Sequence, residues 1–200
     1  MDEFAPQAAI EAAIHEVNRD ENVHGCLLFR PLRRSWTSRT CASCSIRRRI
    51  STASRWHRWP RCSPTARGLP ARDGAACIQL LDHYQVPLQG KHVVVVGRSL
   101  VVGKPVSMML LRRNASVTIC HSKTENLADI MRSADVVICA TGRARTFGAQ
   151  FFGPGQTVLD VGINFDTQGN LCGDVDFAEV EPVVAAITPV PGGIGTVTTS

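Results

Sequence analysis

The chain has 200 residues, 44% of them hydrophobic, which is enough for one large domain or for one and a half small ones. No run approaches the roughly 20 consecutive apolar residues that a membrane-spanning helix requires, and the first residues have neither the basic nor the apolar region of a signal peptide. We therefore expect a cytoplasmic protein without a membrane partner. The formal net charge is +5, but this value averages two unlike parts of the chain.

The beginning of the chain has regular hydrophobic patterns. Residues 8–18 place Ile10, Ile14 and Val17 at helical spacing, which predicts an amphipathic helix. Residues 22–29 follow as a short apolar run that is typical of a buried strand. The chain is therefore expected to open with a helix followed by a strand.

The segment 30–72 differs from the rest in composition. It contains twelve arginines and no lysine, aspartate or glutamate, whereas the remainder has ten basic residues against seventeen acidic ones. All three tryptophans and three of the eight cysteines also lie in this segment, and neither the period of a strand nor that of a helix persists through it. The background of the chain is mildly acidic, and the basic character belongs to this segment alone.

Three interpretations of the segment 30–72 stay open. Its arginines and tryptophans could hold a nucleic acid, by charge on the phosphates and by stacking on the bases. The Cys-x-x-Cys pair at 41–44 could form a zinc site with His57 and Cys62, although a single such pair is a weak signal. We favour the third interpretation, out-of-frame translation of a GC-rich gene, because that produces arginine, serine, proline, cysteine and tryptophan without acidic residues. It predicts no fixed fold, no metal and no nucleic-acid partner for the segment.

Regular patterns resume after the arginine-rich segment. Residues 75–84 predict a helix with its apolar side chains facing a core. A buried strand that ends in four consecutive valines is predicted over 92–96, and it runs directly into the turn Gly-Arg-Ser-Leu-Val-Val-Gly at 97–103. This order of helix, strand and glycine-bounded turn is typical of an α/β domain.

The alternation of strand and helix continues downstream. Apolar strands are predicted over 116–120, 135–140 and 157–161, and helices over 103–113, over 127–132 and from Asp176. Continuous Val, Ile and Leu strands between helices indicate a parallel sheet covered on both faces, so the predicted fold class is α/β with a Rossmann-like sheet. The glycine-rich residues 187–195 are expected to be rigid and to have no partner element after them.

The turn after the four-valine strand is the strongest candidate for a binding site. A glycine-bounded turn between a buried strand and a helix presents backbone N–H groups and a helix N-terminus to a phosphate. Its spacing differs from the usual G-x-G-x-x-G, so a tight turn without a ligand is the alternative. The strand before it and the helix after it favour a nucleotide. Gly97 is expected to permit the turn, and the start of the helix to donate to a pyrophosphate.

The residues after the second strand of this domain favour NADP over NAD. An NAD site places an acidic residue there to bind the ribose 2′-hydroxyl, but residues 120–124 read Cys-His-Ser-Lys-Thr. Ser122 and Lys123 are available instead, and Arg98 projects towards the same corner. A hydroxyl and two cations suit the 2′-phosphate of NADP. Ordinary solvated charges are the alternative interpretation of the two cations.

Other residues give weaker signals. His121 is as consistent with a polar core histidine as with a ligand. Asp160 lies at the end of a predicted strand, where ligands bind in such sheets, but we favour a local role in capping a turn. Cys120, Cys139 and Cys172 are expected to be small buried hydrophobic residues in a reducing compartment.

Five motifs together resemble the bifunctional methylenetetrahydrofolate dehydrogenase/methenyltetrahydrofolate cyclohydrolase family. They are Gly-Arg-Ser-x-x-Val-Gly-Lys-Pro at 97–105, Cys-His-Ser-Lys-Thr at 120–124, Asp-Val-Gly-Ile-Asn at 160–164, Gly-Asp-Val at 173–175 and Ile-Thr-Pro-Val-Pro-Gly-Gly-Ile-Gly at 187–195. The resemblance is continuous over about 75–200 and includes Val-His-Gly at 23–25. In combination these motifs are highly specific.

The resemblance implies two activities, an NADP-linked oxidation of 5,10-methylenetetrahydrofolate and the hydrolysis of the methenyl product to 10-formyltetrahydrofolate. It also implies a folate substrate and a homodimer. The residues that it implies for NADP are Gly97, Arg98, Ser99, Ser122 and Ile163. The residues that it implies for the folate side of the cleft are Pro191, Gly192 and Gly193.

The resemblance is incomplete in the first third of the chain. The family's Tyr-x-x-x-Lys motif is expected upstream of 8–18 and is absent, and its Gln-Leu-Pro-Leu-Pro and Lys-Asp-Val-Asp-Gly motifs would fall within 30–73, where the arginine-rich sequence stands. No catalytic residue can therefore be assigned. The predicted division is a folate-domain remnant over 1–86, an NADP-binding domain over 87–188 and a truncated return segment over 189–200. A non-catalytic NADP-binding fragment is the alternative function.

Overall fold

The structure, a computed structural model, describes residues 7–20, 22–23 and 72–199. They fall into two units, Met1–Pro70 and Ala71–Ser200. Helix α1 (Gln7–Arg19) of the first unit confirms the amphipathic helix predicted there. Residues 24–71, which hold most of the predicted strand and of the arginine-rich segment, lie outside the described part. The hypotheses of nucleic-acid binding, of zinc binding and of a frame shift all fall on these residues.

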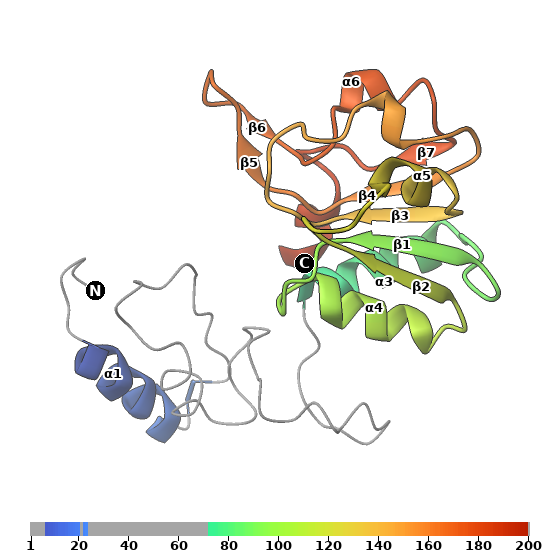
Figure 1. The fold of residues 1–200 in the computed structure, drawn as a ribbon. Helices are drawn as coiled ribbons and strands as arrows, with labels where there is room; N and C mark the ends of the chain where they lie inside the picture. Colours follow the sequence, from blue (N-terminus) through green and yellow to red (C-terminus); the bar gives the residue numbers. More distant parts are fainter. Residues whose placement is uncertain (1–6, 21, 24–71, 200) are drawn as a thin grey trace. The chain divides into compact units, whose positions relative to one another are not determined.

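A five-stranded parallel sheet forms the centre of the second unit (Figure 1). In spatial order its strands are β2 (Ser116–Cys120), β1 (His92–Val96), β3 (Val136–Cys139), β4 (Thr157–Asp160) and β7 (Ala186–Ile187). Every neighbouring pair is parallel. The predicted α/β fold with a Rossmann-like sheet is thus confirmed. Strand β7 was not predicted, since two residues carry no recognisable period.

Helices cover both faces of the sheet, as predicted (Figure 1). On one face α3 (Arg72–His83) packs against α4 (Gly103–Leu111), in a core that includes Val93 and Val95 of β1. On the other face α5 (Leu127–Arg132) lies beside the short 3-10 helix η2 (Ala149–Phe151), in a core that includes Val94 and Val96. Successive valines of β1 therefore face opposite cores, which explains the uninterrupted apolar run.

Helix α3 belongs to the same compact unit as the sheet. Its Ile78 and Leu81 are buried in the core that contains Val93, and the unit begins at Ala71. The sequence-based division had placed this helix in the folate-domain remnant. The prediction that no element follows 187–195 was wrong, because α7 (Ile194–Thr199) begins inside that segment and packs against α3.

Two short elements complete the unit. The antiparallel hairpin of β5 (Asn164–Phe165) and β6 (Leu171–Cys172) projects from the carboxyl edge of the sheet (Figure 1). Its turn is closed by the Asp166 carboxylate, which accepts the N–H groups of Gln168 and Asn170 at 2.9 and 2.8 Å. A one-turn helix, α6 (Phe177–Val180), follows. The short helix predicted from Asp176 is thus confirmed, whereas the strands of the hairpin were not predicted.

The cysteines in and near the strands are buried, as predicted. Cys120 and Cys139 are 0% exposed and Cys172 is 6% exposed. Burial raises the pKa of the Cys139 thiol well above its ordinary value, and it raises that of Cys77 in α3 to about 12. Both thiols therefore stay protonated and unreactive. Among the residues that the structure describes, no helix combines the length and the apolar character that crossing a bilayer requires.

Candidate cofactor-binding site

The strand order reverses between β1 and β3. From β1 the chain builds β2 on one side, and it then returns to build β3 on the other side of β1. Open parallel sheets bind ligands outside the carboxyl ends of their strands at such a switch point. We call residues 97–102 and 140–143, which follow β1 and β3, the switch-point loops.

Gly97 joins the two switch-point loops. Its φ is +131°, a backbone conformation that L side chains rarely adopt, and a Cβ built on it would overlap the carbonyl oxygen of Ala140. Its N–H donates to the carbonyl of Cys120 at the end of β2, at 2.9 Å. The conformational role predicted for Gly97 is confirmed, since only glycine lets the turn lie this close to the end of β3.

Ser99 stabilises the same turn by accepting hydrogen bonds from backbone N–H groups within it. Its hydroxyl oxygen accepts the N–H groups of Val102 at 3.0 Å and of Gly103 at 3.3 Å, and its carbonyl accepts that of Lys104 at 2.9 Å. The first N–H groups of α4 are therefore engaged within the turn. This corrects the expectation that the start of this helix donates to a pyrophosphate. Sequence alone does not show it, because serine in this position is equally suited to binding a phosphate.

A second turn follows β2 and presents the residues predicted for the ribose phosphate. The ring nitrogen Nδ1 of His121 accepts the N–H of Lys123 at 3.1 Å, and the hydroxyl of Thr124 accepts the N–H of His121 at 2.9 Å. Ser122 and Lys123 at the tip are exposed. His121 is thus not a core histidine but a half-buried residue that shapes the turn, and its role as a ligand stays a prediction.

The structure brings Arg98, Ser122 and Lys123 to one edge of the sheet. Arg98 follows Gly97, whose N–H is bonded to the carbonyl of Cys120, two residues before Ser122. Arg98 and Lys123 are exposed, and neither has an acidic partner among the described residues. Two unpaired cations and a hydroxyl therefore gather beside the switch point.

Asp160 at the end of β4 is buried, 3% exposed, and holds neighbouring segments together by hydrogen bonds. Its carboxylate accepts the N–H groups of Gly162, Asp174 and Val175 at 2.9, 3.1 and 2.8 Å. The capping role that we favoured is confirmed, although two of the three partners lie beyond the local turn. Burial raises the pKa of Asp160 from 3.8 to about 6, against the opposing effect of these N–H donors.

The raised pKa of Asp160 predicts a pH-dependent stability. The folded protein keeps this proton up to about pH 6, while the unfolded chain releases it near pH 4. The protonated Asp160 therefore contributes about 3 kcal/mol to the free energy of unfolding. This contribution is fully present below about pH 4 and is lost as the pH rises through about 6. Urea unfolding of the wild type and of Asp160→Asn measures it. The difference in unfolding free energy should change by about 2 to 3 kcal/mol between pH 4 and pH 7, and a constant difference would contradict the assignment.

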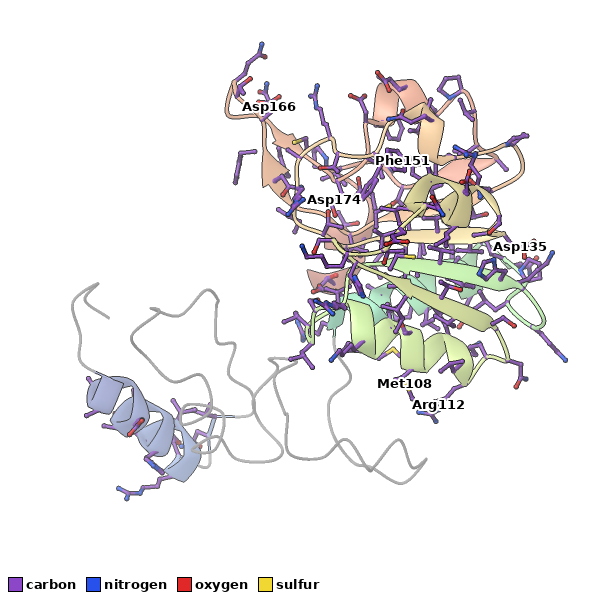
Figure 2. The ribbon with its side chains drawn as sticks, in the orientation of Figure 1. Met108, Arg112, Asp135, Phe151, Asp166 and Asp174 are labelled. Carbon is purple, nitrogen blue, oxygen red and sulfur yellow. The ribbon has the colours of Figure 1, made fainter. Side chains whose placement is uncertain are left out.

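Asp174 is the site residue that sequence reasoning missed. It is 0% exposed, and its carboxylate accepts hydrogen bonds from Thr141, Gly142, Arg143 and Asn164. Figure 2 shows it beside the strand ends, well inside the hairpin tip that Asp166 marks. The available signal was its place in the Gly-Asp-Val motif, but the motif alone does not name its partners.

A small pocket brings together the remaining predicted residues. It encloses about 180 Å³ and is lined by Ile163 on one side and by Pro191, Gly192 and Gly193 on the other. Ile163 is 66% exposed, so its side chain is available to a ligand. The residue implied for NADP and the residues implied for the folate therefore line one pocket at the carboxyl edge of the sheet.

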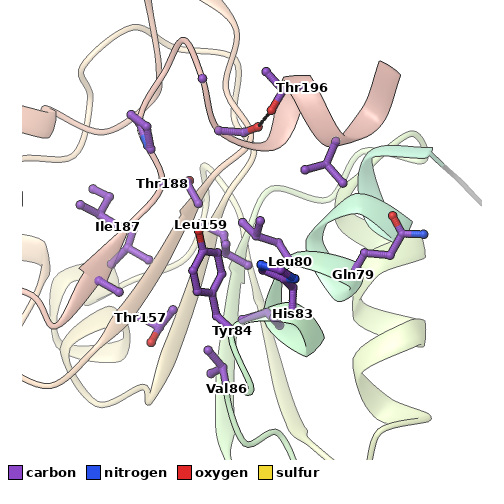
Figure 3. A pocket seen from close by; sticks show the side chains of 17 residues that line it. Gln79, Leu80, His83, Tyr84, Val86, Thr157, Leu159, Ile187, Thr188 and Thr196 are labelled. Carbon is purple, nitrogen blue, oxygen red and sulfur yellow. Dashed lines mark hydrogen bonds between the residues drawn. The ribbon is translucent and has the colours of Figure 1, made fainter. Parts of the chain in front are cut away.

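A larger hollow lies on a face of the sheet, between α3, β4, β7 and α7 (Figure 3). It encloses about 950 Å³, and most of its lining is apolar, including Leu80 and Leu159. Gly192 and Gly193 reach its rim, where the hydroxyl of Thr196 donates to the carbonyl of Gly193 at 2.7 Å. Its place on the face of the sheet separates it from the switch-point loops.

Comparison with known proteins gives a consistent result. Residues 72–200 match the family model described as tetrahydrofolate dehydrogenase/cyclohydrolase, NAD(P)-binding domain. A relative from Carboxydothermus hydrogenoformans, named bifunctional protein FolD, is 44% identical over 197 residues, which are 97% of this chain and 69% of the relative. The solved structure of the bifunctional FolD enzyme from Campylobacter jejuni is 32% identical with a TM-score of 0.88, over 99% of this chain and 71% of that one. The FolD structure from Trypanosoma brucei, described as complexed with NADP cofactor and inhibitor, is 31% identical with a TM-score of 0.84, over 98% and 69%.

Proposed function

Because the chain belongs to the tetrahydrofolate dehydrogenase/cyclohydrolase family, we propose that it binds NADP at the switch point and serves the two reactions of that family. These are the oxidation of 5,10-methylenetetrahydrofolate to the methenyl compound and the hydrolysis of the latter to 10-formyltetrahydrofolate. The observation that carries the proposal is the contact of Gly97 with Ala140, which only glycine permits and which shapes the switch point. The relatives named bifunctional FolD support the reactions.

The switch-point residues fit NADP. Because Gly97 has no Cβ, the loop after β1 lies directly against the Ala140 carbonyl at the end of β3, and this contact sets the shape of the carboxyl edge where such sheets bind nucleotides. Arg98, Ser122 and Lys123 supply two positive charges and a hydroxyl at the corner where the ribose 2′-phosphate of NADP would lie. Ser99 holds the turn in shape through its bonds to Val102 and Gly103. The bound cofactor supplies a hydride acceptor.

The folate would lie towards the pocket between Ile163 and Pro191–Gly193. These residues offer apolar surface and close backbone approach, which orient a flat ring system against the cofactor. The acid–base group of the hydrolysis has no assigned position among the described residues. A homodimer and a cytoplasmic location stay predictions from the resemblance and the sequence.

Two measurements on the full chain test the proposal. Titration with NADPH, followed by its fluorescence, should show saturable binding that NADP displaces. With 5,10-methylenetetrahydrofolate and NADP, formation of NADPH and of the methenyl chromophore should follow. Binding without turnover would establish the alternative, a non-catalytic NADP-binding fragment. No binding to the folded protein would overturn the proposal as a whole.

A further inference from the structure

We propose that Asp174 is a positioning residue of the NADP site, because its buried carboxylate ties the loop after β3 to Asn164 at the start of β5. The inference rests on the proposed function only in taking NADP as the ligand. That Asp174 holds the two segments in place follows from its hydrogen bonds alone. The Gly-Asp-Val motif contains this residue but does not identify its partners, the first of which, Thr141, lies 33 residues away in sequence.

The carboxylate of Asp174 binds two separate segments. One oxygen accepts both the N–H and the hydroxyl of Thr141, the latter at 2.9 Å, and the N–H of Gly142 at 3.1 Å. The other oxygen accepts the N–H of Arg143 at 2.9 Å and the side-chain amide of Asn164 at 2.9 Å. All the donors of the first segment belong to the switch-point loop after β3, and the second segment begins one residue after Ile163.

Both tied segments border the proposed cofactor. Residues 141–143 continue from Ala140, whose N–H donates to the carbonyl of Val96 at 2.8 Å and whose carbonyl abuts Gly97. Asn164 fixes the position of the exposed Ile163 in front of it. A shift of either segment would therefore move a wall of the site without touching the folded core behind it.

Asp174 is itself held rigidly. Its own N–H donates to the Asp160 carboxylate at 3.1 Å, and its carbonyl accepts the N–H groups of Thr146 and Phe147 at 2.7 and 3.1 Å. Among the described residues no cation forms an ion pair with it. A buried carboxylate without a cation is tolerated only when N–H and O–H donors surround it. The buried carboxylate of Asp174 therefore favours the one loop arrangement that supplies all five donors.

The test compares variants of the full chain by NADPH titration and by amide hydrogen exchange. Asp174→Asn replaces one accepting oxygen by a donor, and Thr141→Val removes one hydroxyl bond while keeping the shape. We expect Asp174→Asn to weaken NADPH binding by roughly tenfold or more and Thr141→Val by roughly three- to fivefold. The effect of Thr141→Val should disappear in the Asp174→Asn background. The amides of 141–143 should exchange at least about tenfold faster in Asp174→Asn.

Gln156→Leu is the matched control for a purely structural role. Gln156 is 3% exposed and also makes four hydrogen bonds, to Gly153, Met131, Arg132 and Ala134, but at the opposite edge of the sheet, before β4 begins. The Gln156→Leu variant should have a lower melting temperature, with NADPH affinity and the amide exchange of 141–143 unchanged. Equal NADPH affinity in wild type and Asp174→Asn, or equal losses in Asp174→Asn and Gln156→Leu, would overturn the inference.

The remaining outcomes are also decisive. If Asp174→Asn does not fold, Thr141→Val and Asn164→Ala must each weaken NADPH binding, and unchanged affinity in both refutes the positioning role. If the folded wild type binds no NADPH, the proposed function fails. The exchange of 141–143 then still decides whether Asp174 holds the loops.

Discussion

Replacing Gly97 by alanine is expected to remove measurable NADPH binding and to destabilise the second unit by roughly 3 to 5 kcal/mol. The new Cβ would require an L residue at a φ of +131° and would overlap the Ala140 carbonyl. That carbonyl belongs to the backbone at the end of β3, which the sheet holds in place, so relief requires moving the strand end. Urea unfolding gives the stability, and NADPH titration below the unfolding transition gives the affinity.

Gly155→Ala separates backbone strain from steric overlap. Gly155 also has a positive φ, +83°, but a Cβ on it would meet nothing within 4 Å. The control should cost about 1 kcal/mol and leave NADPH affinity unchanged. If Gly97→Ala binds NADPH within about threefold of the wild type, a factor worth less than 1 kcal/mol, the switch point is not where the cofactor lies.

The sequence predicts the parts of the fold whose buried residues are consecutive in the chain. Strands β1, β3 and β4 are buried on both faces, so each is a nearly continuous apolar run that a short window detects. Strand β2 lies at the edge of the sheet and is partly exposed, but its Val, Thr and Ile still favour a strand. Strands β5, β6 and β7 have two residues each, and no period can be read from so few. Helix α7 contains glycine and threonines, residues of low helix propensity, so its helical state depends on packing against α3.

The residues of the candidate site also fall into those that neighbouring sequence indicates and those that only the structure shows. Gly97, Arg98 and Lys123 could be proposed from the sequence because the argument for each depends only on the strand and the helix beside it in the chain. Asp160 and Asp174 are the same residue type near the same edge, but their partners come from other parts of the chain. A single sequence does not reveal which buried carboxylate meets which N–H group, since three-dimensional contact decides it.

Neutralising the two exposed cations should change the choice of cofactor. Arg98→Ala and Lys123→Ala are each expected to weaken NADPH binding by roughly tenfold, and together by roughly a hundredfold, because each removes a charge-assisted hydrogen bond to the 2′-phosphate. Binding of NADH, which lacks that phosphate, should change by less than about threefold. The preference for NADPH in the wild type should also fall as salt is added, since both cations are exposed.

Arg112→Ala is the matched control for general loss of charge. Arg112 is an exposed arginine at the opposite end of α4 from the Gly97 turn (Figure 2), and it too lacks an acidic partner among the described residues. Long-range attraction alone would make all three variants weaken NADPH binding alike, because each removes one positive charge from the same unit. Direct recognition confines the loss to Arg98 and Lys123 and to the phosphorylated cofactor. Parallel losses for NADPH and NADH in the double variant would instead mean that these side chains contact a part common to both cofactors, and the assignment of the 2′-phosphate to this corner would be wrong.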